Sequence, residues 1–167
     1  MTKGSVRLLT LDDVDAFREV RLRALKEEPT AFMDTYEEMV EQPLENFARY
    51  FESGWIAGAF LDGRLVGTAG LYCNAGRKVM HKGTLWCVYV APEARGKGYA
   101  RRCIELVLHE AKQTGLELVH LSTTADNPVT VSLYKSLGFA AWGIEKHDLK
   151  MSDGSYVDNV VMTKWLT

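Results

Sequence analysis

The chain has 167 residues, 47% of them apolar, which is long and apolar enough for one domain with a substantial core. Its formal net charge of −2 argues against a partner recognised by overall charge, such as nucleic acid or an anionic membrane. The first ten residues, MTKGSVRLLT, lack the apolar core of a signal peptide, and no stretch approaches the ~20 apolar residues of a membrane span. We therefore expect a single cytoplasmic domain over residues 1–167, with no nucleic-acid or membrane partner.

The first half of the chain predicts a strand, two helical regions and a β-hairpin. Residues Val6–Thr10 resemble a short strand, and the acidic pair after Thr10 suits the positive end of a helix. Apolar residues then recur at helical spacing until Pro29. A second helical region covers 35–53 with a break near Pro43, and Asp62-Gly63 between two apolar runs is typical of a hairpin.

The second half predicts alternating strands and helices. Gly83–Val90 is apolar on both faces, as expected of a central strand, and a long helix connects it to a strand over Leu116–Thr123. Such a crossover makes the two strands a parallel pair, while the hairpin neighbours are antiparallel. The remaining predicted elements are a short helix between Asn127-Pro128 and Leu137-Gly138, and two late strands over Phe139–Lys146 and Tyr156–Leu166.

The three cysteines, Cys73, Cys87 and Cys103, are odd in number and lie in apolar stretches. This pattern is typical of buried free thiols in a reducing compartment. A cysteine nucleophile at Cys87 needs a neighbouring cation to stabilise its thiolate, so we expect a buried thiol there.

A basic turn with two glycines, Arg95 to Ala100, lies where the predicted central strand leads into the long helix. Glycine permits close approach of a ligand to the backbone, and the first N–H groups of a helix favour an anion. The alternative is an ordinary surface turn with solvated basic residues. A Walker-type loop is excluded because Lys97 is followed by Gly98, and a dinucleotide fingerprint because its third glycine is missing.

The stretch VYVAPEARGKGYARRCIELVL resembles motif A of the GNAT superfamily of N-acetyltransferases, with Arg95, Gly98 and Ala100 at the signature positions. Residues Asn127–Phe139, NPVTVSLYKSLGF, resemble motif B of the same superfamily. The resemblance implies a GNAT-like α/β (α+β) fold. This fold has a mixed, mostly antiparallel sheet of about six to seven strands, helices on both faces, and one parallel pair at the cofactor cleft. It also implies acetyl-CoA as cosubstrate and no metal.

In the superfamily, the backbone of the glycine turn holds the CoA pyrophosphate, and the preceding strand pairs with the pantetheine arm. Val88 and Val90 occupy those strand positions, although both also suit a core, and Asn127 combines a helix cap with a CoA contact. The implied cofactor-binding residues are Val88, Val90, Arg95, Gly96, Lys97, Gly98, Tyr99, Ala100, Asn127 and Tyr134.

The resemblance places Tyr134 opposite the CoA sulfur. A phenol with a pKa of ~10 can protonate a leaving thiolate with a pKa of ~8.5, which makes Tyr134 the predicted general acid. The alternative is a core aromatic residue on a helix that also buries Val131 and Leu137.

The sequence leaves the identity of the general base open. Some members of the superfamily carry a glutamate on the strand before motif A, whereas the corresponding stretch here, KGTLWCVYV, has no carboxylate. His81, His120 and ordered water are the candidates, because histidine titrates near neutral pH. Each histidine is otherwise a structural or exposed residue.

The resemblance assigns acceptor specificity to the first helices and the late strands. Acidic side chains there can attract a cationic amine, and two aromatic side chains can line its pocket, although solvated charge and core packing explain them equally. These residues are Glu37, Glu38, Glu41, Asp158, Tyr36 and Trp86.

We therefore predict an N-acetyltransferase that moves an acetyl group from acetyl-CoA to a primary amine of a small molecule by direct transfer in a ternary complex. The alternatives are a non-catalytic acyl-CoA sensor and a protein or peptide N-acetyltransferase. Apolar residues on the late strands also predict a homodimer; they include Trp142, Val160, Val161, Met162 and Trp165.

Overall fold

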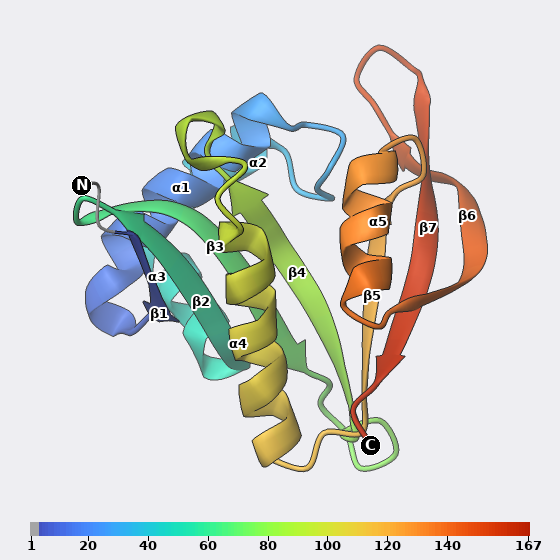
Figure 1. The fold of residues 1–167 in the computed structure, drawn as a ribbon. Helices are drawn as coiled ribbons and strands as arrows, with labels where there is room; N and C mark the ends of the chain where they lie inside the picture. The colour runs from blue at the N-terminus through green and yellow to red at the C-terminus, as the bar shows by residue number, and fades with distance from the viewer. Residues whose placement is uncertain (1–3) are drawn as a thin grey trace.

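The computed structural model describes residues 4–167 as a seven-stranded mixed sheet with helices on both faces (Figure 1). The strand order in the sheet is β1-β2-β3-β4-β5-β7-β6. The strands are β1 (Gly4–Leu8), β2 (Gly54–Leu61), β3 (Arg64–Cys73), β4 (Lys82–Val90), β5 (Leu118–Thr124), β6 (Ala140–Lys150) and β7 (Tyr156–Trp165). The α-helices are α1 (Val14–Glu27), α2 (Tyr36–Val40), α3 (Leu44–Arg49), α4 (Tyr99–Gln113) and α5 (Pro128–Ser136). The predicted order of elements and the predicted fold class are confirmed.

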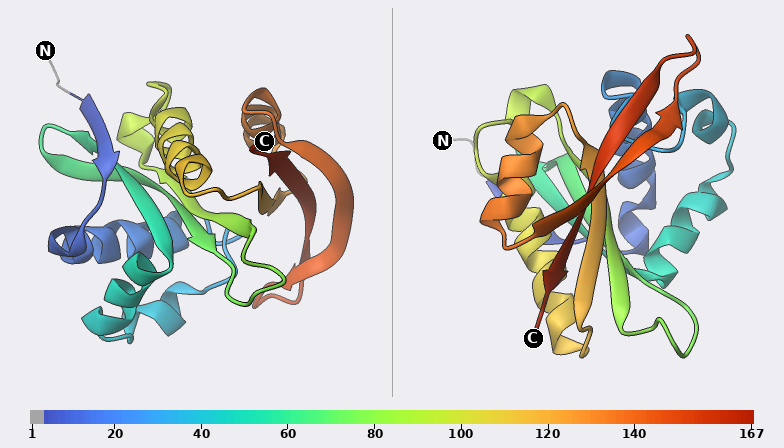
Figure 2. Two further views of the ribbon diagram at one scale, coloured as in Figure 1. Left: turned by 90° about the horizontal axis from the view of Figure 1, so that it is seen from below. Right: turned by 90° about the vertical axis from the view of Figure 1, so that its right-hand side faces the viewer.

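The sheet separates two sets of helices. Helices α4 and α5 cover one face, while α1, α2 and α3 cover the other (Figure 2). The core has two apolar clusters: one contains Ile104 and Val107 of α4, and the other contains Phe17 of α1 and Phe47 of α3.

Local sequence signals explain several boundaries. Asp62 and Gly63 have φ angles of +50° and +79°, as a tight hairpin turn requires. Asp13 accepts a hydrogen bond from the Thr10 backbone N–H and closes a capping box ahead of α1. β6 continues to Lys150, four residues beyond the predicted end at Lys146, because β7 pairs with it along that length through Leu149 and Lys150.

The central parallel pair is short. β4 and β5 pair only at Lys82↔Leu118, Gly83↔Val119 and Thr84↔His120. From Leu85 onward the two strands diverge, as the ribbon shows (Figure 1). The edge of β4 that faces β5 therefore has no strand partner from Leu85 to Val90, although β4 lies in the middle of the sheet.

The late strands divide into buried and exposed positions. Met162 is fully buried, so it belongs to the core of the single chain and is unavailable for a dimer contact, contrary to the sequence interpretation. Val160 and Val161 are half-buried, whereas Trp142 and Trp165 are 65% and 64% exposed.

The cysteines are free, with Cys87 and Cys103 buried and Cys73 half-buried, which confirms the prediction of free thiols for all three and of full burial for two. In the part of the chain from residue 4 to 167, no helix combines the length and apolar character needed to cross a membrane.

Candidate active site

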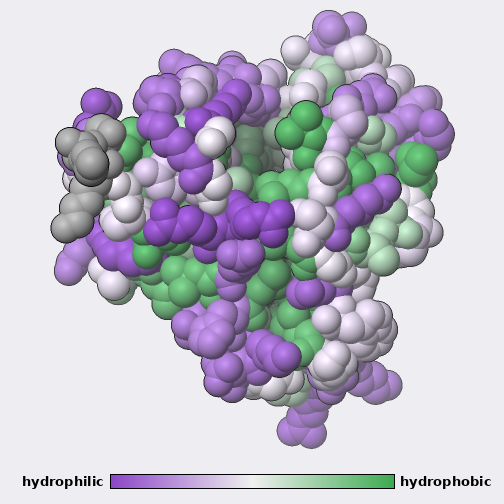
Figure 3. Space-filling model, viewed as in Figure 1, coloured by the Kyte–Doolittle hydropathy of each residue, from purple (hydrophilic) through white to green (hydrophobic). Residues whose placement is uncertain are grey.

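A cavity of about 720 Å³ fills the space where β4 and β5 diverge. Figure 3 shows a hollow with an apolar floor between the two halves of the molecule. One wall is the unpaired edge of β4, and the others come from α5, from the loop between α1 and α2, and from β6 and β7. Its volume lies in the ~300–1,000 Å³ range of ligand sites.

A β-bulge shapes the edge of β4. The register with β3 shifts between Thr68 and Gly70, and Cys87 has a φ of +45°, a left-handed conformation that costs a non-glycine residue ~1–2 kcal/mol. Thr68 Oγ1 donates a 2.8 Å hydrogen bond to the Cys87 carbonyl. A β-carbon on Gly70 would lie 2.5 Å from Trp86 Nε1, so only glycine fits opposite the bulge. These contacts hold Cys87 in a backbone conformation that a non-glycine residue rarely adopts without them.

The backbone of β4 beyond the bulge faces the cavity. Ala91 N–H donates to Val66 on β3, so the polar backbone groups of the preceding residue, Val90, point to the other side. The Val90 carbonyl accepts a 2.9 Å hydrogen bond from Arg95 Nε. Val88 and Val90 both line the cavity and both pack against the core, so the two roles considered from sequence are compatible.

The glycine turn has the geometry of an anion site. Gly96 and Gly98 have φ angles of +74° and +76°, which glycine adopts without the penalty of a β-carbon. Gly98 is the N-cap of the 15-residue helix α4 and has no side chain to satisfy its first N–H groups. The residues from Arg95 to Gly98 are exposed, so these amides lie open to solvent or to a ligand.

The turn residues differ in their relation to the cavity. Arg95 and Ala100 line it, but the four residues between them do not. Tyr99 is buried with its hydroxyl packed against Gly4 of β1, which leaves only its backbone available to a ligand. Lys97 is exposed.

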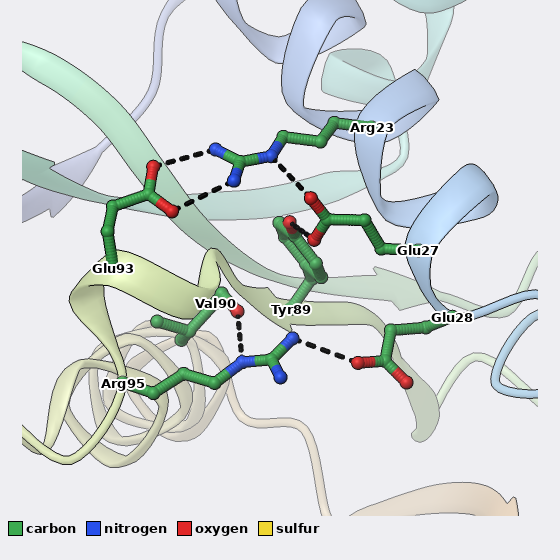
Figure 4. Close-up of polar contacts among 7 residues, drawn as sticks. All are labelled: Arg23, Glu27, Glu28, Tyr89, Val90, Glu93 and Arg95. Atoms are coloured by element: carbon green, nitrogen blue, oxygen red, sulfur yellow. Dashed lines mark hydrogen bonds and ion pairs between the residues drawn. The ribbon is translucent and has the colours of Figure 1, made fainter.

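A polar network connects α1 to this turn (Figure 4). Arg23 of α1 binds both carboxylate oxygens of Glu93, at 2.7 and 2.8 Å, in the short 3-10 turn Pro92–Ala94. This contact lowers the pKa of Glu93 to about 2. Arg95 bridges the Val90 carbonyl and Glu28 at the end of α1. The network fixes the start of the glycine turn relative to both the first helix and the strand that borders the cavity.

Helix α5 is capped at both ends by the residues of the second motif. Asn127 Oδ1 accepts the Thr130 N–H at 3.2 Å, and Pro128 occupies the first turn. At the other end, Gly138 has a φ of +90°, and Phe139 N–H donates to the Tyr134 carbonyl. This is a Schellman arrangement, which explains why glycine ends the helix.

Tyr134 lies in the last turn of α5 and lines the cavity at 5% exposure. Burial raises its pKa well above the usual value, so the phenol stays protonated at neutral pH. Its hydroxyl has no hydrogen-bond partner among residues 4–167. The hydroxyl of Tyr89, by contrast, donates to Glu27. Tyr72 also lines the cavity but is 38% exposed, so Tyr134 is the buried tyrosine of the lining whose hydroxyl is not held by a carboxylate.

The two histidines considered from sequence lie away from the cavity lining. His120 Nδ1 lies 2.7 Å from Thr163 Oγ1, and burial lowers its pKa. His81 sits just before β4, where its carbonyl accepts the Glu117 N–H. Cys87 lines the cavity, but burial raises the pKa of its thiol to about 12, so the thiolate is rare at neutral pH.

The acidic residues considered for the acceptor also lie outside the lining. Glu38 caps α2 through Thr35, Asp158 binds Lys146, and Glu37 and Glu41 are exposed. Tyr36 packs against Lys26, whereas Trp86 and Asn127 line the cavity.

Sequence reasoning missed several polar residues of the lining, among them Arg21, Asp34, Asp148 and Asn159. One signal was available, because Arg21 interrupts the apolar face of α1 formed by Phe17, Val20 and Ala24. A charged residue on a core-facing stripe indicates either a buried ion pair or a site. Over residues 4–167, no group of three or more His, Cys, Asp or Glu side chains is arranged to hold a metal ion.

Residues 15–139 match the sequence profile of the acetyltransferase (GNAT) family, and the chain belongs to that family. The family resemblance recognised in its two motifs is thus confirmed.

Named relatives and a solved structure agree with this assignment. The chain is 29% identical to a mycothiol acetyltransferase of Cellulomonas flavigena, over 80% of this chain and 39% of that protein. It is 27% identical to the ribosomal protein bS18 alanine N-acetyltransferase of Haemophilus ducreyi, over 53% of this chain and 61% of that protein. A putative acetyltransferase from Salmonella typhimurium, solved with its cofactor acetyl-CoA, superposes with a TM-score of 0.83 at 19% identity and covers 98% of this chain and 94% of that one. The aligned regions thus span less than two thirds of these curated relatives' own length.

Proposed function

We propose that this chain is an acetyl-CoA-dependent N-acetyltransferase that acetylates a primary amine of a small molecule. The observation that carries the proposal is the convergence on one cavity of the unpaired β4 edge, the start of the glycine turn and a buried phenol. Family membership supplies the chemistry, and these features supply a place for each part of it.

The residues fit acetyl-CoA. The free amides at the start of α4 and the left-handed glycines suit the pyrophosphate, since a helix N-terminus favours an anion. The unpaired edge near Val88 and Val90 suits an extended amide-containing arm, which can pair with it like an added strand. Arg95 holds the Val90 carbonyl, and its positive charge lies at the start of the anion site.

In the proposed reaction, the neutral acceptor amine attacks the carbonyl carbon of the thioester. A C–N bond forms, the C–S bond breaks, and the departing thiolate takes the Tyr134 proton. The proton lost from the nitrogen leaves through ordered water, which we favour because neither His81 nor His120 lines the cavity. Proton return to Tyr134 restores the enzyme.

The enclosure of the acceptor end supports a small acceptor. The cavity is bordered on one side by Ala31–Asp34 and on the other by Asp148, Leu149 and Asn159. An extended peptide acceptor needs an open groove. A groove of that kind would favour the alternative, which is protein acetylation. The relatives' names include both kinds, a mycothiol acetyltransferase and a ribosomal-protein alanine acetyltransferase.

The test is release of CoA thiol from acetyl-CoA with a panel of amino acids, polyamines, aminoglycosides and short peptides. Turnover with a small amine and little turnover with peptides supports the proposal. Tight acetyl-CoA binding without turnover for any acceptor indicates a non-catalytic sensor.

We further propose a cytoplasmic single-domain protein that forms a homodimer. Three free cysteines suit a reducing compartment. Exposed Trp142, Ile144 and Trp165 on the late strands supply apolar surface for a second copy.

A further inference from the structure

Among residues 4–167, the side-chain nitrogen and oxygen atoms that are shielded completely from solvent and lack a hydrogen-bond partner belong to two residues. They are Nε and Nη1 of Arg21 and Oδ1 of Asn159. Both residues line the cavity described above. A buried polar group without a partner costs ~1–3 kcal/mol, and most such groups in native proteins are satisfied. Two exceptions in one cavity indicate that a ligand supplies the missing partners.

Arg21 presents a buried positive charge to the cavity. The residue is 5% exposed, and its Nη2 binds Asp34 Oδ2 at 2.8 Å. The planar guanidinium has five N–H donors, so one carboxylate oxygen uses a small part of its capacity. Its carbon lies 4.7 Å from the ring centroid of Phe32 and 5.7 Å from that of Trp86. Contact with aromatic rings restricts the orientation of the guanidinium, which suits recognition of a planar anion.

Phe32 controls access to this charge. Nε and Nη1 are covered, and the Phe32 ring lies over the guanidinium, so we expect that ring to move when an anionic group binds. Phe32 is half-buried and sits in the loop between α1 and α2, outside any helix or strand. Its displacement therefore breaks no backbone ladder.

Asn159 presents an acceptor from β7. It is 6% exposed, and its Nδ2 donates to Asp148 Oδ2 on β6. A carboxylate oxygen only accepts, so the amide nitrogen must face Asp148, and Oδ1 is left without a donor. Asn159 pairs with Thr124 at the end of β5, which also lines the cavity.

We propose that the acetyl acceptor is an amino acid or a close analogue, with its anionic group bound by Arg21 and an N–H of its amine bound by Asn159 Oδ1. One buried donor and one buried acceptor in the same cavity match an acceptor that carries both an anion and an amine. An N–H donated to Asn159 keeps the nitrogen lone pair free for attack. Asp148 adds a negative charge that attracts the ammonium form before its proton is lost. This inference rests on the proposed acetyltransferase function.

The competing explanation is that Arg21 only holds Asp34 and the loop that carries it. The two explanations differ in selectivity. A structural role changes activity toward all acceptors alike, whereas recognition of an anion changes the ratio between acceptors with and without one.

The experiment compares kcat/KM for an amino acid, its carboxamide and its decarboxylated amine at saturating acetyl-CoA. We expect the wild-type protein to prefer the amino acid ~10–100-fold, as a charge-assisted hydrogen bond predicts. The carboxamide has the more acidic ammonium and more free amine, so amine availability cannot produce a preference for the amino acid over the carboxamide. Arg21→Met should abolish it, and Arg21→Lys should retain part of it. Asn159→Leu should raise KM for all three acceptors.

Arg18→Met is the matched control. Arg18 lies one turn earlier on α1, is half-buried, and donates to the Val40 carbonyl outside the cavity. Its loss should lower stability without changing the acceptor ratio. The proposal is overturned if wild-type protein treats acid and carboxamide alike, if only amines without an anion react, or if Arg21→Met lowers all three activities equally. The wild-type ratio decides even where Arg21→Met fails to fold. Absence of turnover with every amine tested contradicts the proposed function itself.

Discussion

The ring of Phe139 packs edge-on against the ring of Tyr134, with the centroids 5.9 Å apart and the planes at 69°. Phe139 also donates its N–H to the Tyr134 carbonyl. Backbone and side chain of the same residue therefore orient the proposed general acid, which explains how a phenol at the end of a nine-residue helix is held in place.

Tyr134→Phe keeps the ring contact with Phe139 and removes only the proton donor. We expect kcat to fall ~10²–10⁴-fold, with nearly unchanged acetyl-CoA affinity. The defect should shrink with an acyl donor whose thiol is more acidic, because that leaving group needs less help. Single-turnover kinetics provide the measurement. A native rate of the chemical step in this variant would assign proton donation to water or to another residue.

Gly98→Asp should weaken acetyl-CoA binding more than ~10-fold, because a carboxylate then stands beside the pyrophosphate. Gly115→Asp is the matched control. Both glycines have left-handed φ angles, +76° and +83°, with open space around a β-carbon, and they flank opposite ends of α4. Calorimetry should show a loss of affinity for the first variant only. Equal affinities in the two folded variants would exclude the turn as the binding site.

Gly70→Ala should distort the bulge in β4. Its β-carbon would lie 2.5 Å from Trp86 Nε1 and 2.9 Å from Cys87 Sγ. We expect a loss of ~1–3 kcal/mol in stability, as for overpacking, and a higher KM for acetyl-CoA. Gly143→Ala on β6, where a β-carbon meets nothing within 4 Å, is the control. Chemical denaturation and steady-state kinetics test both; a normal KM for Gly70→Ala would separate the bulge from cofactor binding.

Stability should decline in alkali because of the buried thiols. Burial raises the pKa of Cys87 and of Cys103 to about 12. A thiol in the unfolded chain has a pKa of ~8.5. The contribution of each buried thiol to the free energy of unfolding is therefore fully present below that pH, and it is lost as the pH rises toward the pKa of the folded state. Each thiol should contribute up to ~1.4 kcal/mol per pH unit in this window. Cys103→Ala should flatten the slope in urea titrations between about pH 9 and 11. An unchanged slope would show that this thiol does not contribute.

Light scattering should give twice the chain mass of 18.8 kDa at micromolar concentration if the homodimer forms. Trp142→Lys, on the exposed edge strand β6, should then shift the protein toward monomer. A wild-type monomer at that concentration contradicts the proposed assembly.

The fold could be predicted because apolar periodicity, turn residues and helix caps are local signals. Asp62-Gly63 and Asn127-Pro128, for example, specify a turn and a helix start without tertiary information. The bulge at Cys87 could not be predicted in this way. No residue in TLWCVYV predicts a left-handed conformation at Cys87, because that conformation depends on Thr68 and Gly70 on the neighbouring strand.

The candidate site was only partly predictable for the same reason. Tyr134 was found through the family resemblance, because a tyrosine on an apolar helix face usually indicates core packing. Asn159 and Asp148 could not be found, since their pairing arises only when β6 and β7 meet. Arg21 was detectable as a break in an apolar stripe, but its unpaired nitrogens required the folded structure.

The three-pair ladder between β4 and β5 divides the molecule into two lobes that share little backbone bonding at the cavity. A pantetheine arm that pairs with β4 would contact both lobes and stabilise their relative position. Cosubstrate at 100 times its dissociation constant should stabilise the folded chain by ~2.7 kcal/mol. Amide protons along both borders of the cavity should then exchange with solvent together and more slowly, so that one small molecule makes two lobes behave as a single elastic body.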